Sequence, residues 1–337
     1  MITEPITKAD KAREARTNYG MAMPSLKLAR ILYAANPLLF KNVEEARSAL
    51  RYAEGKHGNE HRKFAQNTDF FVEAERPKNP YNLPESYQEK REPFHLPPHC
   101  NNILLISDLH IPYHDIQAVT LALDYGVQKK CNTIFINGDL IDFATISRFE
   151  KDFKKRSVKQ EFEAAKDFLV VLRNTFPTAD IYWLKGNHCT RLEKFLAQKA
   201  CEIWDDPYFH LEERLALHEQ KVKLLDDTVL VKAGKLNITH GHHIFKGVFA
   251  PVNPARGAYL KAKASVIVGH LHRASHDPEI DIDGKVISCW STGCLCELRP
   301  GYNPLVSNSQ HGFAHITIEE DGRYRVSNFQ IIDGELR

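Results

Sequence analysis

Short apolar runs alternate with amphipathic stretches from about residue 102 onward. The runs at 103–106, 133–136 and 181–184 are rich in isoleucine, leucine and aromatic residues, which is typical of buried strands. We expect helices at 116–129, 158–176 and 190–204, further strands at 236–239, 266–268 and 286–290, and a closing hairpin from residue 313. Helices that alternate with buried strands predict an α/β domain.

Residues 10 to about 91 have a helical pattern instead. Ser25 is positioned to cap a helix whose apolar residues recur over 26–32. Asn42, followed three residues later by Glu45, predicts the start of a second helix that ends near residue 55. The chain therefore has a small helical module ahead of the α/β domain.

Two short helices joined by a polar turn are compatible with a helix-turn-helix module. Arg47, Arg51 and Lys56 would lie on or just after the second helix, and they are candidate nucleic-acid-binding residues. Four glutamates close to them dilute the basic character. The alternative is an ordinary helical cap or a partner-binding arm with a solvated, mixed-charge surface.

The stretch from Pro77 to Pro98 is rich in proline, asparagine, glutamate and tyrosine and has no clean period, which is typical of a linker. We therefore expect a helical N-terminal module at 1–76, a linker at 77–100 and the main domain at 101–337.

Composition narrows the class of protein. The 45 lysine and arginine residues balance 43 aspartate and glutamate residues, so the chain is neither a polybasic nucleic-acid coat nor an acidic tail protein. No apolar run approaches the roughly 18 residues of a membrane helix, and the first residues lack the pattern of a secretory signal. The seven cysteines are odd in number and lack paired zinc spacing, so we expect a reducing, cytoplasmic location and no membrane partner.

Polar residues follow five of the expected strands, usually beside a glycine. They are Asp108 and His110, then Asp139 and Asp142, then Asn187 and His188, then His240 with His242 and His243, and finally His270 and His272. In α/β folds, ligands bind in the crevice beyond the carboxyl ends of the strands. Strands of shared orientation would bring these side chains to one patch.

Carboxylate, amide and imidazole ligands without thiolate suit divalent Mn, Fe, Zn, Co or Ni. The patch offers more ligands than one ion needs, so two ions bridged by one carboxylate are the economical interpretation. Two ions about 3.5–4 Å apart stabilise the attacking and leaving oxygens of an in-line displacement, which points to hydrolysis of a phosphate ester. Each short motif alone is weak evidence for a metal site, and the prediction rests on all five motifs occurring in this order.

The ordered set resembles the motifs of the calcineurin-like metallophosphoesterases. The matching motifs are Asp108-x-His110, Gly138-Asp139-x-x-Asp142, Gly186-Asn187-His188, His240-Gly241 and Gly269-His270-x-His272. The resemblance covers roughly the last two-thirds of the chain. It implies a four-layer α-β-β-α sandwich with a dinuclear metal centre at the strand ends.

The resemblance also implies a role for each residue. Asp108, His110, Asp139 and His272 correspond to the ligands of a first metal, and Asp139, Asn187, His240 and His270 to those of a second. A bridging hydroxide would be the nucleophile, because coordination lowers the pKa of water to about 7. His188 would be the catalytic histidine, which protonates the leaving oxygen or stabilises the phosphoryl oxygens, and Asp142 would orient His188 rather than bind metal.

One position departs from the family pattern. The family usually has an acidic residue directly after Gly-Asn-His, and this chain has Cys189. A thiol cannot orient an imidazole as a carboxylate does, so acid catalysis by His188 is the property affected. Asp142 is the candidate replacement.

Three further residues are candidates for substrate binding. Arg191 and Arg256 could hold phosphate oxygens in bidentate fashion, and ordinary surface salt bridges are the alternative for each. His242 could contact substrate beside His240, or simply be a polar loop residue.

These residues predict a phosphoesterase that uses two divalent ions, with Mn favoured. The basic residues of the N-terminal module favour a nucleic-acid or nucleotide phosphodiester as substrate. The alternatives are a phosphomonoesterase acting on protein or small molecules, and an adaptor of weak catalytic power that binds nucleic acid or another partner.

Overall fold

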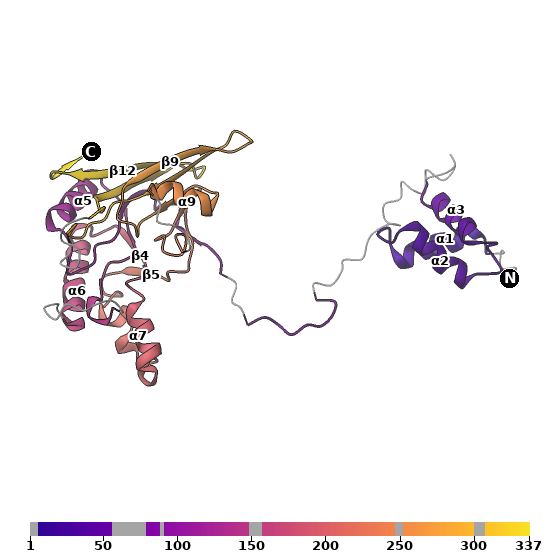
Figure 1. Ribbon diagram of the computed structural model, residues 1–337, viewed down its shortest axis with the longest axis horizontal. Coiled ribbons are helices and arrows are strands. Elements are labelled where there is room, and N and C mark those ends of the chain that lie inside the picture. Colours follow the sequence, from indigo (N-terminus) through magenta and orange to yellow (C-terminus); the bar gives the residue numbers. More distant parts are fainter. Residues whose placement is uncertain (1–5, 56–78, 88–90, 148–156, 247–251, 300–306) are drawn as a thin grey trace. The chain divides into compact units, whose positions relative to one another are not determined.

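The computed structural model describes residues 6–55, 79–87, 91–147, 157–246, 252–299 and 307–337 (Figure 1). The chain divides into two compact units, residues 1–89 and 90–337. Among the described residues, no helix has the length and apolar character needed to cross a membrane.

The first unit is built from three helices, α1 (Lys8–Tyr19), α2 (Ser25–Ala35) and α3 (Val43–Ala53). The apolar faces of all three helices share one small core. As predicted, Asn42 caps α3, because its side chain accepts a hydrogen bond from the backbone N–H of Glu45 at 2.8 Å. Lys56 lies outside the described residues.

The prediction that Ser25 caps α2 is wrong. Pro24 occupies the N-cap position, and the Ser25 hydroxyl instead donates to a carboxylate oxygen of Glu54 at 2.9 Å. Glu54 also forms a buried ion pair with Arg16, whose guanidinium donates to the backbone oxygen of Met23 at 2.7 Å. The hydroxyl therefore helps to satisfy a buried charge rather than a helix end.

The second unit contains a seven-stranded sheet in the order β13-β12-β11-β2-β3-β4-β5. Strands β2 to β5 are mutually parallel, and β11, β12 and β13 continue the sheet antiparallel. The bounds are β2 (Asn102–Ile106), β3 (Thr133–Asn137), β4 (Asp180–Leu184), β5 (Val222–Leu225), β11 (His311–Ile318), β12 (Tyr324–Ile332) and β13 (Glu335–Leu336).

A second, six-stranded sheet has the order β1-β6-β7-β8-β10-β9. Its strands are β1 (Phe94–His95), β6 (Val231–Ala233), β7 (Leu236–Ile238), β8 (Val266–Val268), β9 (Ser275–Ile280) and β10 (Val286–Ser291). The pair β7–β8 is parallel, like β2 to β5 of the first sheet. Strand β1 lies inside the stretch that its composition assigns to a linker, and it pairs in parallel with β6.

The two sheets pack face to face, and helices cover their outer faces. Alternate residues of β2 divide between two cores: Ile103 and Leu105 face the second sheet, and Leu104 and Ile106 face the helices. On the first sheet these helices are α5 (Ile116–Gln128) and α6 (Val158–Thr175); α9 (Pro254–Ala262) packs against β8 and β10 of the second sheet (Figure 1). The predicted four-layer α-β-β-α sandwich is confirmed.

Shorter helices complete the first helical layer. They are α7 (Arg191–Lys199), α8 (Leu211–Arg214) and the 3₁₀ turns η2 (Ala144–Ile146), η3 (Cys201–Ile203) and η4 (Pro207–Phe209). The helix expected at 190–204 ends at Lys199, because the backbone leaves the helical region at Ala200 before the turn η3.

Candidate metal centre

Five loops at the ends of parallel strands carry the residues singled out in the sequence. Asp108 and His110 follow β2, Asp139 and Asp142 follow β3, Asn187 and His188 follow β4, His240 follows β7, and His270 and His272 follow β8. The first three strands belong to one sheet and the last two to the other. The loops therefore approach one another where the two sheets present their carboxyl ends.

One group of side chains surrounds the buried carboxylate of Asp108. Its Oδ1 lies 3.3 Å from Nε2 of His272, and Nε2 of His272 lies 3.1 Å from Nε2 of His110. The Oδ2 of Asp139 lies 4.0 Å from the same His110 nitrogen. These four residues are the set that the resemblance gives to a first metal.

A second group lies on the other side of Asp139. Its Oδ2 is 3.1 Å from Nε2 of His240, which is 3.3 Å from Oδ1 of Asn187. Nitrogen and oxygen atoms of Asp139, His240 and His270 all lie within 4.8 Å of one another. Asp139 therefore borders both groups, as a bridging carboxylate must.

The outer ring nitrogens of two histidines are fixed by hydrogen bonds. Nδ1 of His240 donates to the backbone oxygen of Asn137 at 2.8 Å, and Nδ1 of His110 lies 2.9 Å from Oδ1 of Asp142. With the proton on Nδ1, each ring turns an Nε2 lone pair toward the carboxylates. Oδ1 of Asp108 is buried and has no hydrogen-bond partner among the described residues. Inward lone pairs and an orphaned carboxylate oxygen fit a divalent cation.

The charge state of part of the cluster suits the same role. At His240 burial is outweighed by the carboxylates of Asp139 and Asp108, which raise the pKa to about 9, so a metal ion must displace a proton there. Burial alone would raise the pKa of Asp139, but the facing imidazoles of His240 and His188 hold it well below its usual range. Burial, together with the neighbouring His240, lowers the pKa of His270 to about 4. At neutral pH Asp139 is ionised and His270 is neutral, which are the forms that bind metal.

The backbone at this centre is unusual. Asp108, His110, Asp139, His270 and His272 all have positive φ, between 42° and 69°. Non-glycine residues rarely adopt this left-handed region, and each such residue costs of order 1–3 kcal/mol. Strain of this kind is found at functional sites, where it orients side chains that regular strands would point elsewhere.

His188 lies beside the two groups and is held by Asp142 and Arg191. Its Nδ1 is 2.8 Å from Oδ1 of Asp142, the same oxygen that contacts His110. Nη2 of Arg191 lies 2.8 Å from Nε2 of His188, and Nη1 donates to the backbone oxygen of Asp142 at 2.8 Å. The thiol of Cys189 is fully buried and belongs to the hydrophobic core. The His188 ring is therefore oriented by Asp142.

The structure does not bring the other candidate residues into this cluster. Arg256 on α9 forms ion pairs with Asp277 and Glu279 on β9. Nε2 of His242 lies 3.0 Å from Oδ2 of Asp227. Their substrate-binding roles remain predictions.

In the first unit, Arg47 lies on α3 with Nη1 at 3.5 Å from a carboxylate oxygen of Glu44. Arg51 lies in the last turn of the same helix.

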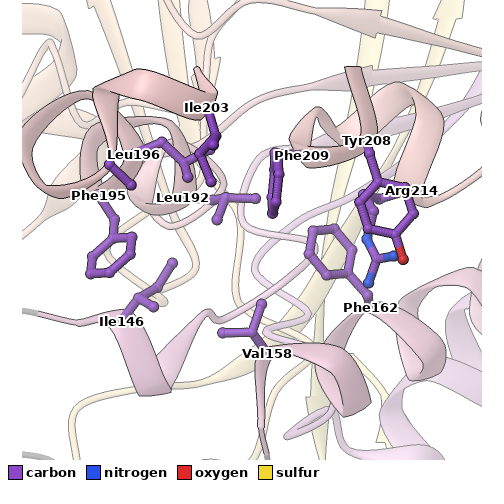
Figure 2. A pocket seen from close by; sticks show the side chains of 11 residues that line it. Ile146, Val158, Phe162, Leu192, Phe195, Leu196, Ile203, Tyr208, Phe209 and Arg214 are labelled. Atoms are coloured by element: carbon purple, nitrogen blue, oxygen red, sulfur yellow. The ribbon is translucent and has the colours of Figure 1, made fainter. Parts of the chain in front are cut away.

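An apolar pocket of about 260 Å³ is lined in part by residues close in sequence to Asp142 and His188 (Figure 2). Leu192, which follows Arg191 on α7, and Ile146, four residues after Asp142, both line it. Figure 2 shows Tyr208 beside the Arg214 guanidinium, which lies 4.3 Å from the tyrosine ring centre. No local sequence pattern predicts this pocket, because its lining comes from several elements that are separate in the sequence.

Comparison with known proteins agrees with this arrangement. A family model described as calcineurin-like phosphoesterase matches residues 102–279, which is more than half of the chain. The chain belongs to the calcineurin-like phosphoesterase family. The protein is therefore a metallophosphoesterase, a metal-dependent hydrolase of phosphoric esters.

Other proteins are similar over much of the chain. The Gene 54 protein of Mycobacterium phage L5 is 27% identical over 230 residues, which cover 64% of this chain and 89% of that protein. Vps29 of Entamoeba histolytica, crystallised with Zn²⁺, is 18% identical and covers 70% of this chain and 96% of its own, with a TM-score of 0.37. The E. coli phosphoesterase Yfce is 14% identical. It covers 67% of this chain and 98% of its own, with a TM-score of 0.34.

Three supporting residues were not among the predicted site residues. Asn137, whose backbone oxygen orients His240, is the last residue of β3. Ser107 donates to the Asp108 carboxylate and to the backbone oxygen of Asn137. Sγ of Cys296 lies 3.8 Å from Nδ1 of His272. Ser107 and Asn137 each stand directly before one of the predicted motifs, and that position is the one clue to them in the sequence.

Proposed function

We propose that this metallophosphoesterase holds two divalent ions, with manganese favoured, and hydrolyses phosphodiester bonds of a nucleic acid or nucleotide. Asp108, His110, Asp139 and His272 hold the first ion, and Asp139, Asn187, His240 and His270 hold the second. The observation that carries this proposal is the position of Asp139, whose Oδ2 lies 3.1 Å from His240 and 4.0 Å from His110. When bound, such an ion pair activates water and neutralises phosphoryl oxygens.

The chain's own residues orient the group that passes a proton to the leaving oxygen. Burial lowers the pKa of His188 against the opposing pull of the Asp139 carboxylate, so the ring is neutral at pH 7. Asp142 holds Nδ1, which leaves Nε2 as the atom that faces the leaving oxygen once Arg191 turns to substrate. Arg191 then donates to a phosphoryl oxygen, and Nε2 of His188, after taking up a proton from solvent, donates it to the leaving oxygen.

The charge of the first unit supports nucleic acid as substrate. The three-helix part of this unit, residues 6–55, contains nine lysine and arginine residues against five aspartate and glutamate residues, and the whole unit, residues 1–89, contains 14 against 12. A net positive helical unit attracts the phosphate backbone, and Arg47 and Arg51 on α3 are the residues that we expect to contact it.

The test is a comparison of phosphoesters with Mn²⁺ and the full chain. We expect turnover of bis-p-nitrophenyl phosphate to exceed that of p-nitrophenyl phosphate, and Asp139→Asn to abolish both. Turnover of the monoester alone would replace this proposal with a phosphomonoesterase. Binding of duplex DNA without any turnover would replace it with an adaptor.

A further inference from the structure

A second cluster of metal-binding side chains lies next to the candidate centre. Asp227, in the loop after β5, faces His242 and His243, in the turn after β7. The Nε2 atoms of His242 and His243 lie 3.0 Å and 3.2 Å from the same oxygen, Oδ2 of Asp227. None of these residues belongs to the two groups around Asp139.

The turn explains how two consecutive histidines reach one point. The backbone N–H of Phe245 donates to the oxygen of Gly241 at 3.0 Å, which closes the turn around His242 and His243. Gly241 has a φ of 112°, a conformation that favours glycine. As a result the two rings lie 4.0 Å apart, centre to centre, and point to the same carboxylate.

The spacing of the three ligand atoms matches a metal site. They all lie within 4.8 Å of one another. Zinc binds imidazole nitrogen and carboxylate oxygen at about 2.0–2.2 Å, so tetrahedral ligands lie about 3.3–3.6 Å apart. The observed separations from Oδ2 of Asp227 are close to that range, and a small outward shift of each side chain would admit the ion.

Burial also suits a site that an ion can enter. The side chains of Asp227 and His242 are each 12% exposed, whereas that of His243 is 49% exposed. Two of the ligands, Asp227 and His242, are therefore largely buried, and the third, His243, lies on the side that faces solvent. Three protein ligands leave a fourth position for water or an anion.

We propose that Asp227, His242 and His243 bind a third divalent ion, of the zinc class, separate from the family's metal pair. The ring of His242 lies 5.5 Å from that of His240 and 6.1 Å from that of His270, centre to centre. The third ion adds positive charge beside the candidate centre. His242 then acts on anions through this ion rather than by direct contact.

The test is the zinc content of the full chain after saturation and removal of free metal, measured by inductively coupled plasma mass spectrometry. We expect three ions per chain in the parent and two in His243→Ala and in Asp227→Asn. The matched control His218→Ala removes an exposed histidine elsewhere and retains three. Because His243 is half exposed, its variant keeps the test valid even if Asp227→Asn fails to fold.

Equal zinc content in the parent and in His243→Ala would overturn the third site. Asp139→Asn separates this outcome from failure of the metal pair. If Asp139→Asn loses zinc and His243→Ala does not, the pair stands and the third site is wrong. If His243→Ala loses one ion and Asp139→Asn loses none, the third site stands and the pair is wrong.

Discussion

At the scale of single residues, Asp139 connects the two halves of the centre. Its Oδ2 faces His240, and its Oδ1 accepts the backbone N–H of His188 at 2.8 Å. The residue is almost completely buried, so its charge must be compensated by neighbours. Asp142 connects the side chains around the centre in a similar way, because one of its oxygens contacts both His110 and His188.

Asp142→Asn should lower kcat by about 10–100-fold, the usual range when a residue that orients a ligand is lost. The amide cannot hold two imidazole N–H groups as the carboxylate does. The pH profile of kcat should shift as well, because the proton on His188 is no longer fixed. Asp283→Asn, in an exposed turn, is the control. Activity equal to that of the parent would contradict the role of Asp142.

Glu161 on α6 gives a test by pH. Burial, followed by the charge of Asp142, raises the pKa of Glu161 to about 7. The folded protein therefore disfavours the ionised form. The contribution of Glu161 to the free energy of unfolding is highest below pH 4.5. It falls as the pH rises through 7, by about 3 kcal/mol in total. Glu161→Gln should remove this fall, as measured by urea unfolding between pH 4.5 and 8. If the free energy of unfolding changes with pH in the same way in the parent and in Glu161→Gln, the raised pKa of Glu161 is contradicted.

At the scale of elements, the loops after β3 and β8 each combine a glycine with a candidate ligand of positive φ, Gly138 with Asp139 and Gly269 with His270. A Cβ at Gly186 would lie 2.2 Å from Oδ1 of Asp139, and one at Gly269 would lie 2.7 Å from Oδ2 of Asp108. These glycines let neighbouring loops approach to the distance at which one ion can bind both. The packed sheets beneath the loops provide the stability that offsets the backbone strain.

Gly138→Ala should reduce metal affinity by about 10–100-fold. The new Cβ would lie 2.0 Å from Nδ1 of His240, and the ring would have to leave its place beside Asp139. Gly284→Ala is the control, because it also has positive φ but has open space around it. Isothermal titration with Mn²⁺ measures the difference. If both variants bind Mn²⁺ with equal affinity, crowding at His240 is not the cause.

The sequence predicted the regions of the fold that have strong local patterns. The strands β2, β3 and β4 are continuous apolar runs, and their ends carry the site residues. Strand β9, with the sequence Ser-His-Asp-Pro-Glu-Ile, escaped prediction because it alternates at a sheet edge and contains proline. The contact between Asp227 and His242 was also beyond prediction, because a contact between two loops has no local period.

At the scale of the whole molecule, the two units contribute different properties. The second unit contains every residue of the candidate centre, and the first carries the excess of basic residues. Within the first unit, the buried pair of Arg16 and Glu54 ties α1 to the end of α3. The core of this unit is small, so that pair matters for its stability.

Glu54→Ala should destabilise the first unit by about 3–5 kcal/mol, the usual cost of removing one partner of a buried ion pair. Arg16 would be left as an uncompensated buried charge. Circular dichroism should show a separate, earlier loss of helix in the variant. Lys8→Ala, which breaks a partly exposed pair with Glu45, is the control and should change stability by less than about 1 kcal/mol. Equal melting of the two variants would contradict this expectation.

Removal of Arg47 and Arg51 together tests the nucleic-acid proposal. The double alanine variant should bind DNA more weakly, and the slope of log affinity against log salt should fall by about 2. Lys129→Ala with Lys130→Ala removes the same charge from the second unit and is the matched control. An equal loss of affinity in both double variants would show that α3 is not the contact surface.

The central claim is that five loops place their carboxylate, amide and imidazole groups around a shared pair of ions. Anomalous diffraction from crystals soaked in Mn²⁺ tests it most directly. We expect two peaks about 3.5–4 Å apart, with Asp139 between them. Absence of any peak within coordinating reach of Asp139 would contradict the claim.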